Sequence, residues 1–346
     1  MKILKQVVGI DVAQKELVVS YGIIKDDLQA EIVSNKTFGN TNDGFLKLLS
    51  WVKKISDGES NVHFVMEATG VYHESFAYFL DEQNLSVSIV LPNKISNYFK
   101  TLDVKTITDS TSAQAIARFG LERKLELWKR PKPIFKSLRQ LTRERNQIIE
   151  ERTMVKNHLH AELSEAEPNE SSVARIKERI KLLDKQEKQV TAAIRKGAQH
   201  PQIKDSVTVM SSIPGIATLT AVTVLAETNG FELIRNKKQL TSYAGLDVKE
   251  KESGTSVKGK ARISKRGNKN LRRCLYMPIL ATIRSDQHFK AIYARLVSRN
   301  GIKMKAAVAI QRKALELMYT LYKKNEHYDA HYESKQNSQK RERQLL

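Results

Sequence analysis

Residues 6–21, QVVGIDVAQKELVVSY, decide the fold of the first part of this chain. Two apolar runs, Gln6–Asp11 and Glu16–Tyr21, are separated by a short polar connection. β-Branched runs joined by so short a connection pair as a hairpin, so this stretch predicts two antiparallel strands. The first strand ends at Asp11, which places a carboxylate at the end of a buried strand.

The following residues alternate strand and helix signals. Three more strands are expected, over residues 30–38, Val62–Met66 and Val87–Leu91. Helices are expected over Asn42–Ile55, from its apolar periodicity, and over His73–Leu80. A hairpin followed by alternating strands and helices predicts an α/β domain, a mixed sheet covered by helices, over residues 1–125.

Three acidic residues stand at the ends of these elements: Asp11, Glu67 and Asp109. Asp11 and Glu67 each follow an apolar run, and Asp109 opens an amphipathic stretch. Mg²⁺-assisted phosphodiester chemistry needs a few carboxylates that converge on one point. With this strand order, the three acids match the ribonuclease-H-like arrangement and predict a metal site. Taken singly, Asp109 is better explained as a helix N-cap and Asp11 as a turn residue.

The chain is strongly basic. Lys and Arg (59) exceed Asp and Glu (38) by 21, which predicts a polyanionic partner but names no reaction. The single cysteine, Cys274, excludes an internal disulfide and fits a reducing cytoplasm, with a packing role preferred over that of a nucleophile. No apolar run approaches the ~20 residues of a membrane span, and the first residues do not look like a signal peptide. A cytoplasmic protein with no membrane partner is therefore expected.

Residues 131–200 are charged and almost free of glycine. Apolar residues recur at helical spacing at Val173, Ile176, Ile180, Leu183, Val190 and Ile194, interrupted by Glu187. A looser stripe over residues 138–159 has Arg145 and Arg152 in its gaps. This pattern predicts two long helices that form an antiparallel hairpin or a coiled coil with another subunit. A solvated helical spacer is the alternative.

A third, mostly α-helical region is expected over residues 205–325. Pro214-Gly215 precedes a helix, and backbone N–H groups at such a turn can hold a phosphate, as in helix-hairpin-helix modules. Eight of the sixteen residues from Lys258 to Arg273 are basic: Lys258, Lys260, Arg262, Lys265, Arg266, Lys269, Arg272 and Arg273. Such a cationic loop suits a nucleic-acid backbone. The Ser253 hydroxyl beside Gly254 is a conceivable nucleophile, although the residues alone favour a plain loop serine.

The three acidic residues and the basic loop, in this order and separated by a helical hairpin, resemble the DEDD-type transposases of the bridge-RNA-guided insertion sequences. GIDVAQKELVV and MEATGVY are similar to the first two acid motifs of that family, and KTITDSTSAQAIARFG to the segment with the last two. IPGIATLTAVTVLAE and YAGLDVKEKESGTSVKGKARISKRGNKNLRRCLYMPIL are similar to its C-terminal signature. The resemblance spans roughly residues 5 to 325.

The resemblance implies a RuvC-like N-terminal domain, a coiled-coil connection and a C-terminal domain with a nucleophilic serine. By motif position, Asp11, Glu67 and Asp109 would bind Mg²⁺ or Mn²⁺, and Ser253 would attack DNA. Ser112 stands where the family has its fourth acid. A hydroxyl can bind Mg²⁺ but adds no charge, so Asp103 is the candidate substitute.

The predicted function is that of a DNA recombinase that transposes an insertion sequence. The resemblance implies donor and target DNA, a bridge RNA and a homo-oligomer, dimer or tetramer, as partners. One alternative is a metal-dependent, structure-specific endonuclease of the Holliday-junction-resolvase type. Another is an inactive nucleic-acid-binding protein, because Ser112 weakens the acid set. Residues 326–346 lack apolar periodicity and are expected to be disordered.

Overall fold

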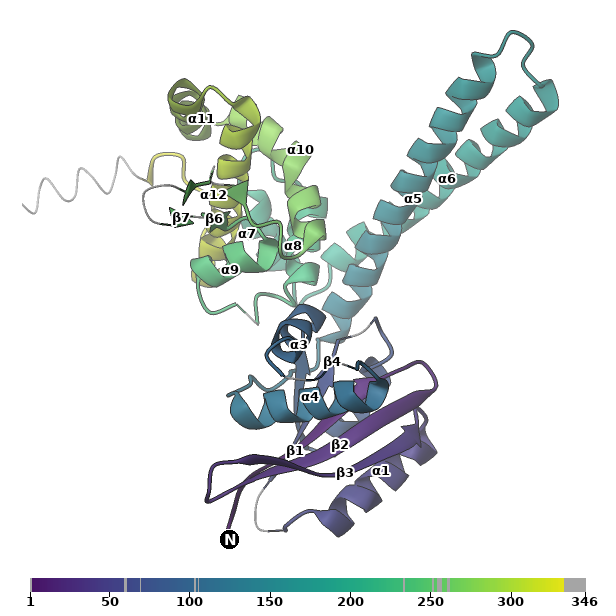
Figure 1. The fold of residues 1–346 in the computed structure, drawn as a ribbon. Coiled ribbons are helices and arrows are strands. Elements are labelled where there is room, and N and C mark those ends of the chain that lie inside the picture. Colours follow the sequence, from purple (N-terminus) through teal and green to yellow (C-terminus); the bar gives the residue numbers. More distant parts are fainter. Residues whose placement is uncertain are drawn as a thin grey trace, which may run out of the picture. The chain divides into compact units, whose positions relative to one another are not determined.

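The computed structural model describes residues 2–58, 61–68, 70–102, 104, 106–232, 234–250, 252–253, 257–259 and 262–332. The chain divides into two compact units, Met1–Arg130 and Pro131–Leu346. The first unit contains the large sheet and the second the long helices (Figure 1).

The first unit is built on a five-stranded mixed sheet. Its strands are β1 (Ile3–Val12), β2 (Glu16–Lys25), β3 (Ala30–Gly39), β4 (Val62–Glu67) and β5 (Ser86–Val90), in the spatial order β3-β2-β1-β4-β5. The strands β1, β2 and β3 are antiparallel, whereas β4 runs parallel to β1 and β5 parallel to β4. This is the ribonuclease-H-like order, so the predicted fold class of the domain is confirmed.

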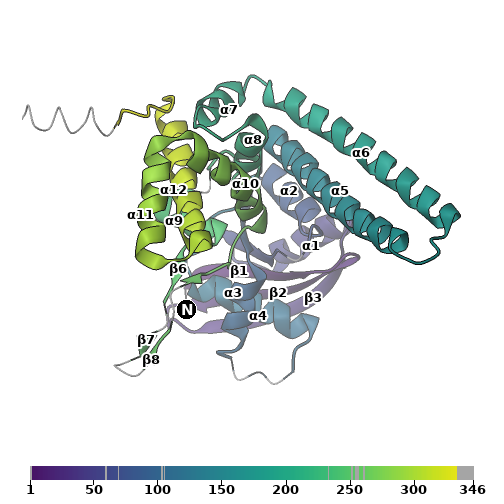
Figure 2. The same cartoon turned by 90° about the horizontal axis from the view of Figure 1, so that it is seen from above.

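Helices cover both faces of this sheet (Figures 1 and 2). They are α1 (Asn42–Ile55), α2 (Glu74–Glu82), α3 (Pro92–Phe99) and α4 (Asp109–Glu122). Val8 and Ile10 of β1 share a core with α1 and α2, whereas Val7 shares another with Ile116 of α4. Successive side chains of a strand point to opposite faces, so Asp11 points to the face that α4 covers.

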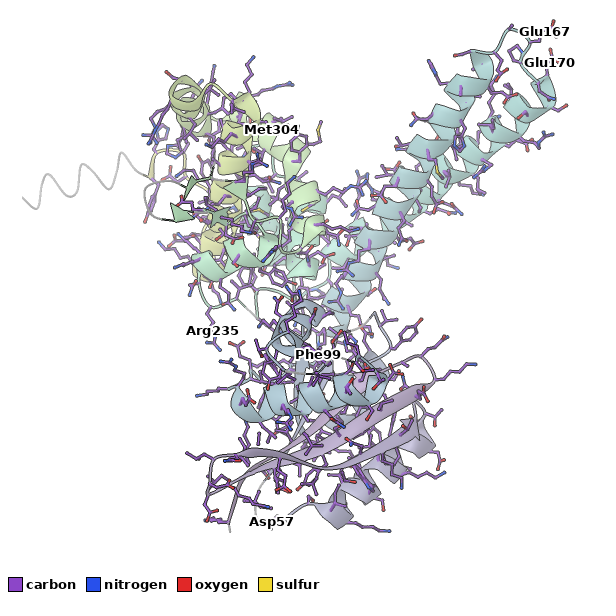
Figure 3. All side chains as sticks on the ribbon, in the orientation of Figure 1. Asp57, Phe99, Glu167, Glu170, Arg235 and Met304 are labelled. Carbon is purple, nitrogen blue, oxygen red and sulfur yellow. The ribbon has the colours of Figure 1, made fainter. Side chains whose placement is uncertain are left out.

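The second unit begins with two long helices, α5 (Pro133–Leu163) and α6 (Glu170–Ala198), which pack against each other within one chain. Figure 3 shows Glu167 and Glu170 at the tip of this hairpin. The predicted antiparallel hairpin is therefore present within one chain, and its pairing with another subunit stays a prediction.

A polar network explains why the apolar stripes of the hairpin are interrupted. Glu187 of α6 accepts a hydrogen bond of 2.7 Å from Arg145 and another from Arg152 of α5. Arg152 also donates to Asp184, again at 2.7 Å. The charged residues in the gaps of one stripe therefore pair with the acid that breaks the other.

The rest of the second unit is mostly helical, as predicted. Its helices are α7 (Lys204–Ser211), α8 (Thr218–Glu227), α9 (Lys237–Ala244), α10 (Lys269–Ser285), α11 (Gln287–Asn300) and α12 (Lys303–Lys324). Between α9 and α10 lie four short strands, β6 (Val248–Lys249), β7 (Glu252–Ser253), β8 (Val257–Lys258) and β9 (Arg262–Ile263). Across the described ranges, no helix has the length and apolar character needed to cross a membrane.

The chain remains described for several residues after α12. Tyr328 donates its hydroxyl to Asp286 at 2.7 Å, and its backbone N–H donates to Ser212 at 2.8 Å. The remainder of the tail expected to be disordered, residues 333–346, lies outside the described residues.

Candidate active site

Helix α4 lies very close to β1 at Gly9. A Cβ added at Gly9 would lie 2.2 Å from the backbone nitrogen of Ala117 and 2.6 Å from the carbonyl oxygen of Ala113. Further along α4, Gly120 lies against the side chain of Val7, because a Cβ added there would lie 2.8 Å from Cγ1 of Val7. The glycine in the first strand motif is thus explained by close backbone approach. Because α4 runs from Asp109 toward Val7, its first turn lies beyond Gly9, near the carboxyl end of β1.

Asp11 and Glu67 stand side by side at this end of the sheet. The parallel register pairs Gly9 with Val65 and Ile10 with Met66, so the next step brings Asp11 beside Glu67. Burial, followed by the charges of Asp109 and Glu67, raises the pKa of Asp11 to about 6. A carboxyl group whose pKa is raised by two other carboxylates marks a point where negative charge converges.

The three acids share this place without forming a complete metal cluster. Within the described part of the chain, no group of three or more Asp, Glu, His or Cys side chains could hold a metal ion. Asp11 and Glu67 are half-buried, and Asp109 is exposed. The acids that the sequence singled out are neighbours, and their ligand geometry is incomplete.

The start of α4 shows that the simple interpretation of Asp109 as a helix N-cap is wrong. The N-cap is Thr108, whose hydroxyl oxygen accepts a hydrogen bond of 3.2 Å from the backbone N–H of Thr111. Asp109 is the first residue of the helix and does not have the capping position that the sequence allowed. Ser112, three residues later, is half-buried, and Asp103 lies outside the described residues.

The second candidate cluster is the segment 248–267, called here the basic arm. At its base β6 pairs with β9, Val248 opposite Ile263. Further along, β7 pairs with β8, and the backbone of Ser253 lies opposite Val257. The predicted nucleophile therefore stands in a short antiparallel ladder within the arm.

The predicted phosphate contacts in this region differ in exposure. Arg262, Lys265, Arg266 and Lys269 are exposed. Lys260 lies outside the described residues, and Lys258 is described only as part of the backbone ladder of β8.

Two arginines of α10 are engaged within the unit. Arg272 is half-buried and donates to the carbonyl oxygen of Ala244 at 2.7 Å, so it holds α10 to the end of α9. Arg273 is exposed and forms an ion pair with Glu150 of α5.

Gly215 also has a structural role. Its φ of +87° lies in the left-handed region, and an added Cβ would lie 2.4 Å from the backbone nitrogen of Thr282. Only glycine fits this turn, because it packs directly on α10. Gly215 is nevertheless exposed, so this packing leaves its contact with a phosphate open.

The sequence reasoning missed Glu227, the last residue of α8. Its side chain is only 1% exposed, and it pairs with Arg143 of α5. The available signal was an acid at the end of the otherwise uncharged segment TLTAVTVLAE. Buried carboxylates are rare unless they are paired, and the ion pair with Arg143 accounts for the burial of Glu227.

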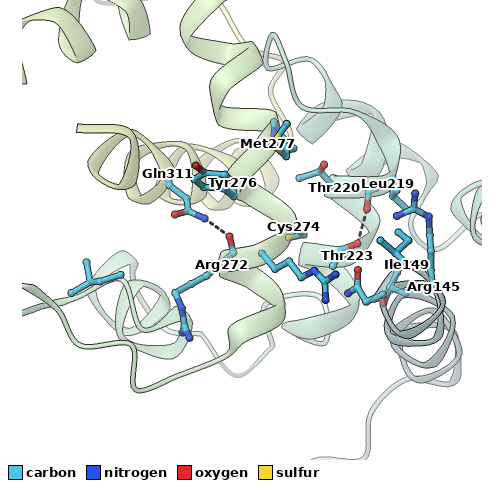
Figure 4. A pocket seen from close by; sticks show the side chains of 15 residues that line it. Arg145, Ile149, Leu219, Thr220, Thr223, Arg272, Cys274, Tyr276, Met277 and Gln311 are labelled. Atoms are coloured by element: carbon cyan, nitrogen blue, oxygen red, sulfur yellow. Dashed lines mark hydrogen bonds between the residues drawn. The ribbon is translucent and has the colours of Figure 1, made fainter. Parts of the chain in front are cut away.

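A cavity of about 790 Å³ opens between α5, α8 and α10 (Figure 4). Its lining includes Arg145 and Arg273, but each of these cations already pairs with a glutamate. Cys274 also lines the cavity, and burial, together with the charge of Glu227, raises the pKa of its thiol. The thiol therefore stays protonated near neutral pH, which fits the packing role expected for this cysteine.

Two transposase family models match the two parts of the chain that carry these clusters. The model for the DEDD transposases of the IS110 type matches residues 8–168. The model described as "Transposase IS116/IS110/IS902 family" matches residues 207–294. The chain belongs to the IS110 family of DEDD transposases. The acid cluster falls in the first matched region, and Ser253 and Glu227 fall in the second.

Relatives of this transposase support the same assignment. The pilin gene-inverting protein of Moraxella bovis is 28% identical over 331 residues, which cover 94% of this chain and 98% of that protein. The transposase for insertion sequence element IS1111A of Coxiella burnetii is 30% identical over 125 residues, covering 34% of this chain and 33% of the relative.

Among solved structures, Thermus thermophilus RuvC in complex with a Holliday junction substrate is similar over 36% of this chain and 99% of RuvC. The TM-score is 0.28 and the sequence identity 10%. The assignment of the sheet rests on its own strand order.

Proposed function

We propose that this transposase cuts and rejoins DNA through attack of Ser253 on a phosphodiester. The observation that carries the proposal is that one chain contains both clusters, the converging acids and the serine-bearing basic arm, each inside one of the two matched family regions. The name of the Moraxella relative, a pilin gene-inverting protein, supports a reaction that rejoins strands as well as cutting them.

In the proposed step, Oγ of Ser253 forms a bond to phosphorus while the bond from phosphorus to the leaving sugar oxygen breaks. The serine gives up its proton, and the leaving oxygen takes one up. The product is a serine–DNA phosphodiester, so the number of phosphodiester bonds is unchanged. A sugar hydroxyl can then attack this ester and release Ser253, which joins the strands.

We propose that Asp11, Glu67 and Asp109, which are neighbours but do not form a ready three-ligand group among the described residues, are the side chains that hold Mg²⁺ or Mn²⁺, with Ser112 and Asp103 as candidates for a further ligand. Oxygen donors suit such cations. The pKa of Asp11 is raised first by burial and then by the charges of Asp109 and Glu67, and a divalent cation would offset those two charges. Bound there, the cation would stabilise charge that develops on the phosphate. A serine nucleophile makes the missing charge at Ser112 more tolerable, because no water needs to be ionised.

Cations of the arm and of α10 would contact donor and target DNA. The turn at Gly215 would add a backbone contact with a phosphate. This set of cations is Lys258, Lys260, Arg262, Lys265, Arg266, Lys269, Arg272 and Arg273. The exposed members suit phosphate groups, and contacts of this kind position DNA without selecting its sequence. A bridge RNA from the same element and assembly into a dimer or tetramer complete the proposal.

A covalent adduct tests the proposal directly. The purified chain is incubated with Mg²⁺, labelled DNA carrying the ends of its element, and RNA transcribed from that element. A denaturing gel should show a protein–DNA species for the wild type and none for Ser253→Ala. An adduct of normal yield from Ser253→Ala would exclude the serine role.

The same reactions, run on the denaturing gel and also on a native gel, separate the two alternatives. A metal-dependent endonuclease that uses water would release free ends and form no adduct, and Asp11→Asn would stop it. An inactive nucleic-acid-binding protein would retain the DNA in a native gel and produce neither free ends nor adduct.

A further inference from the structure

Glu227 stands where α8 ends, and its side chain is buried from solvent. Arg143 grips the carboxylate with two parallel hydrogen bonds, 2.8 Å from Nε to Oε1 and 2.9 Å from Nη2 to Oε2. Asn268 donates to Oε2 at 2.7 Å, and Asn270 donates to Oε1 at 3.0 Å. The described residues thus give each carboxylate oxygen two donors, which matches its acceptor capacity.

These donors come from distant parts of the second unit. Arg143 belongs to α5, whereas Asn268 and Asn270 stand at the junction of the basic arm and α10. Asn268 is also the N-cap of α10, since its Oδ1 accepts from the backbone N–H groups of Asn270 and Leu271. Glu227 therefore fixes the residue at which the arm ends and the helix begins.

Further contacts bind the base of the arm to the same point. The hydroxyl of Tyr243 donates to the backbone oxygen of Glu227 at 2.9 Å. The backbone carbonyl oxygen of Tyr243 accepts from the backbone N–H of Asn268 at 2.8 Å. An added Cβ at Gly267 would lie 2.5 Å from that same oxygen and 2.5 Å from the nitrogen of Gly245. The two ends of the arm are thus closed on each other, and Glu227 lies behind the closure.

Glu227 stays ionised, which suits a residue that holds the base of the arm through hydrogen bonds. Burial would raise its pKa, but the hydrogen bonds from Arg143 and Asn268, together with the charge of Arg143, outweigh burial and lower it. A carboxylate kept charged in a buried place binds its donors more tightly than a neutral group would. Glutamine in its place would leave one acceptor oxygen for two of the four donors and would set an NH₂ group against the other two.

We infer that Glu227 is a positioning residue for strand cleavage, because it sets the direction in which the basic arm leaves the helical core. The inference rests on the proposed function, since it takes the arm to carry the reactive group. Glu227 acts through Asn268 and Asn270 on the arm and does not touch DNA. It should therefore change the rate of cleavage more than the affinity for DNA.

The test compares Glu227→Gln with Glu232→Gln, a matched control. Glu232 lies five residues further on and accepts from Asn229 and Lys132, neither of which belongs to the arm. For both variants, single-turnover cleavage at saturating element-end DNA is measured as the sum of adduct and free ends. DNA affinity, thermal unfolding and trypsin cleavage within residues 248–267 are measured alongside.

Glu227→Gln should slow cleavage by roughly 100-fold, the loss typical of a misplacement of about 1 Å. Its DNA affinity should stay at the wild-type value, and trypsin should cut the arm faster. Glu232→Gln should match the wild type in rate and in arm proteolysis. If Glu227→Gln fails to fold, Asn270→Ala, which removes one donor on the arm side, should give the same pattern at a smaller amplitude.

A wild-type cleavage rate in a folded Glu227→Gln or Asn270→Ala protein would overturn the inference. A rate loss that merely follows the loss of thermal stability in both glutamate variants would overturn it as well. Free ends without adduct from the wild type would instead refute the serine mechanism. The comparison of total cleavage rates would still decide the role of Glu227.

Discussion

Replacing Gly9 by alanine should uncouple α4 from the sheet. The new Cβ would lie 2.2 Å from the nitrogen of Ala117 and 2.6 Å from the oxygen of Ala113, both of them backbone atoms. Non-bonded heavy atoms are comfortable near 3.5 Å, so α4 must move by about 1 Å. Overpacking of this kind costs about 1–3 kcal/mol, or roughly 4–12 °C in Tm.

The same movement should lower activity. Asp109 begins α4, so a shift of about 1 Å moves it relative to Asp11, and cleavage should slow by roughly 100-fold. The matched control is Gly58→Ala, because an added Cβ at Gly58 meets no described atom within 4 Å. Tm by scanning calorimetry and single-turnover cleavage are measured for both variants. A Gly9→Ala protein as stable and as active as Gly58→Ala would refute the placement of α4 on β1.

Three other outcomes follow from the described contacts. Because the pKa of Asp11 is raised, its charged form destabilises the fold above about pH 6. In EDTA, Asp11→Asn should therefore raise the free energy of unfolding by about 1 kcal/mol at pH 8. That gain should fade as the pH falls to 4, and urea titrations in which it persists there would contradict the assignment. Glu187→Ala leaves two arginines of α5 without their shared acceptor and should cost about 1–3 kcal/mol by thermal denaturation, whereas Lys188→Ala should cost little. If exposed Lys265 contacts a phosphate, Lys265→Gln should reduce the slope of log K against log salt by about 1, and an unchanged slope would remove it from the interface.

The sequence predicts the elements of the first unit well because their signals are local. Asn42–Ile55 coincides with α1, and the five predicted strands all occur with shifts of a few residues at their ends. One helix is missed: α3 begins at Pro92, directly after the strand expected over Val87–Leu91, since proline suits the first turn of a helix.

Among the candidate site residues, too, the sequence predicts those marked by local signals and misses those that depend on distant contacts. Asp11 and Glu67 follow their strands directly, so the parallel register brings them together once the sheet order is known. The network of Glu227 depends on residues 41 to 84 positions away, and no periodicity in the sequence reports such contacts. The role of Gly9 is hidden for the same reason, because a glycine in a strand does not reveal which helix lies against it.

Sequencing of the covalent adduct tests the central claim most directly. Wild-type protein is reacted with Mg²⁺, element-end DNA and the element's RNA, digested with nuclease and trypsin, and analysed by tandem mass spectrometry. Cleavage after Lys251 and Lys258 isolates the peptide ESGTSVK, in which fragment ions distinguish Ser253 from Thr255 and Ser256. The account predicts a nucleotide on Ser253. A nucleotide on another residue, or cut DNA without any modified peptide, would contradict it.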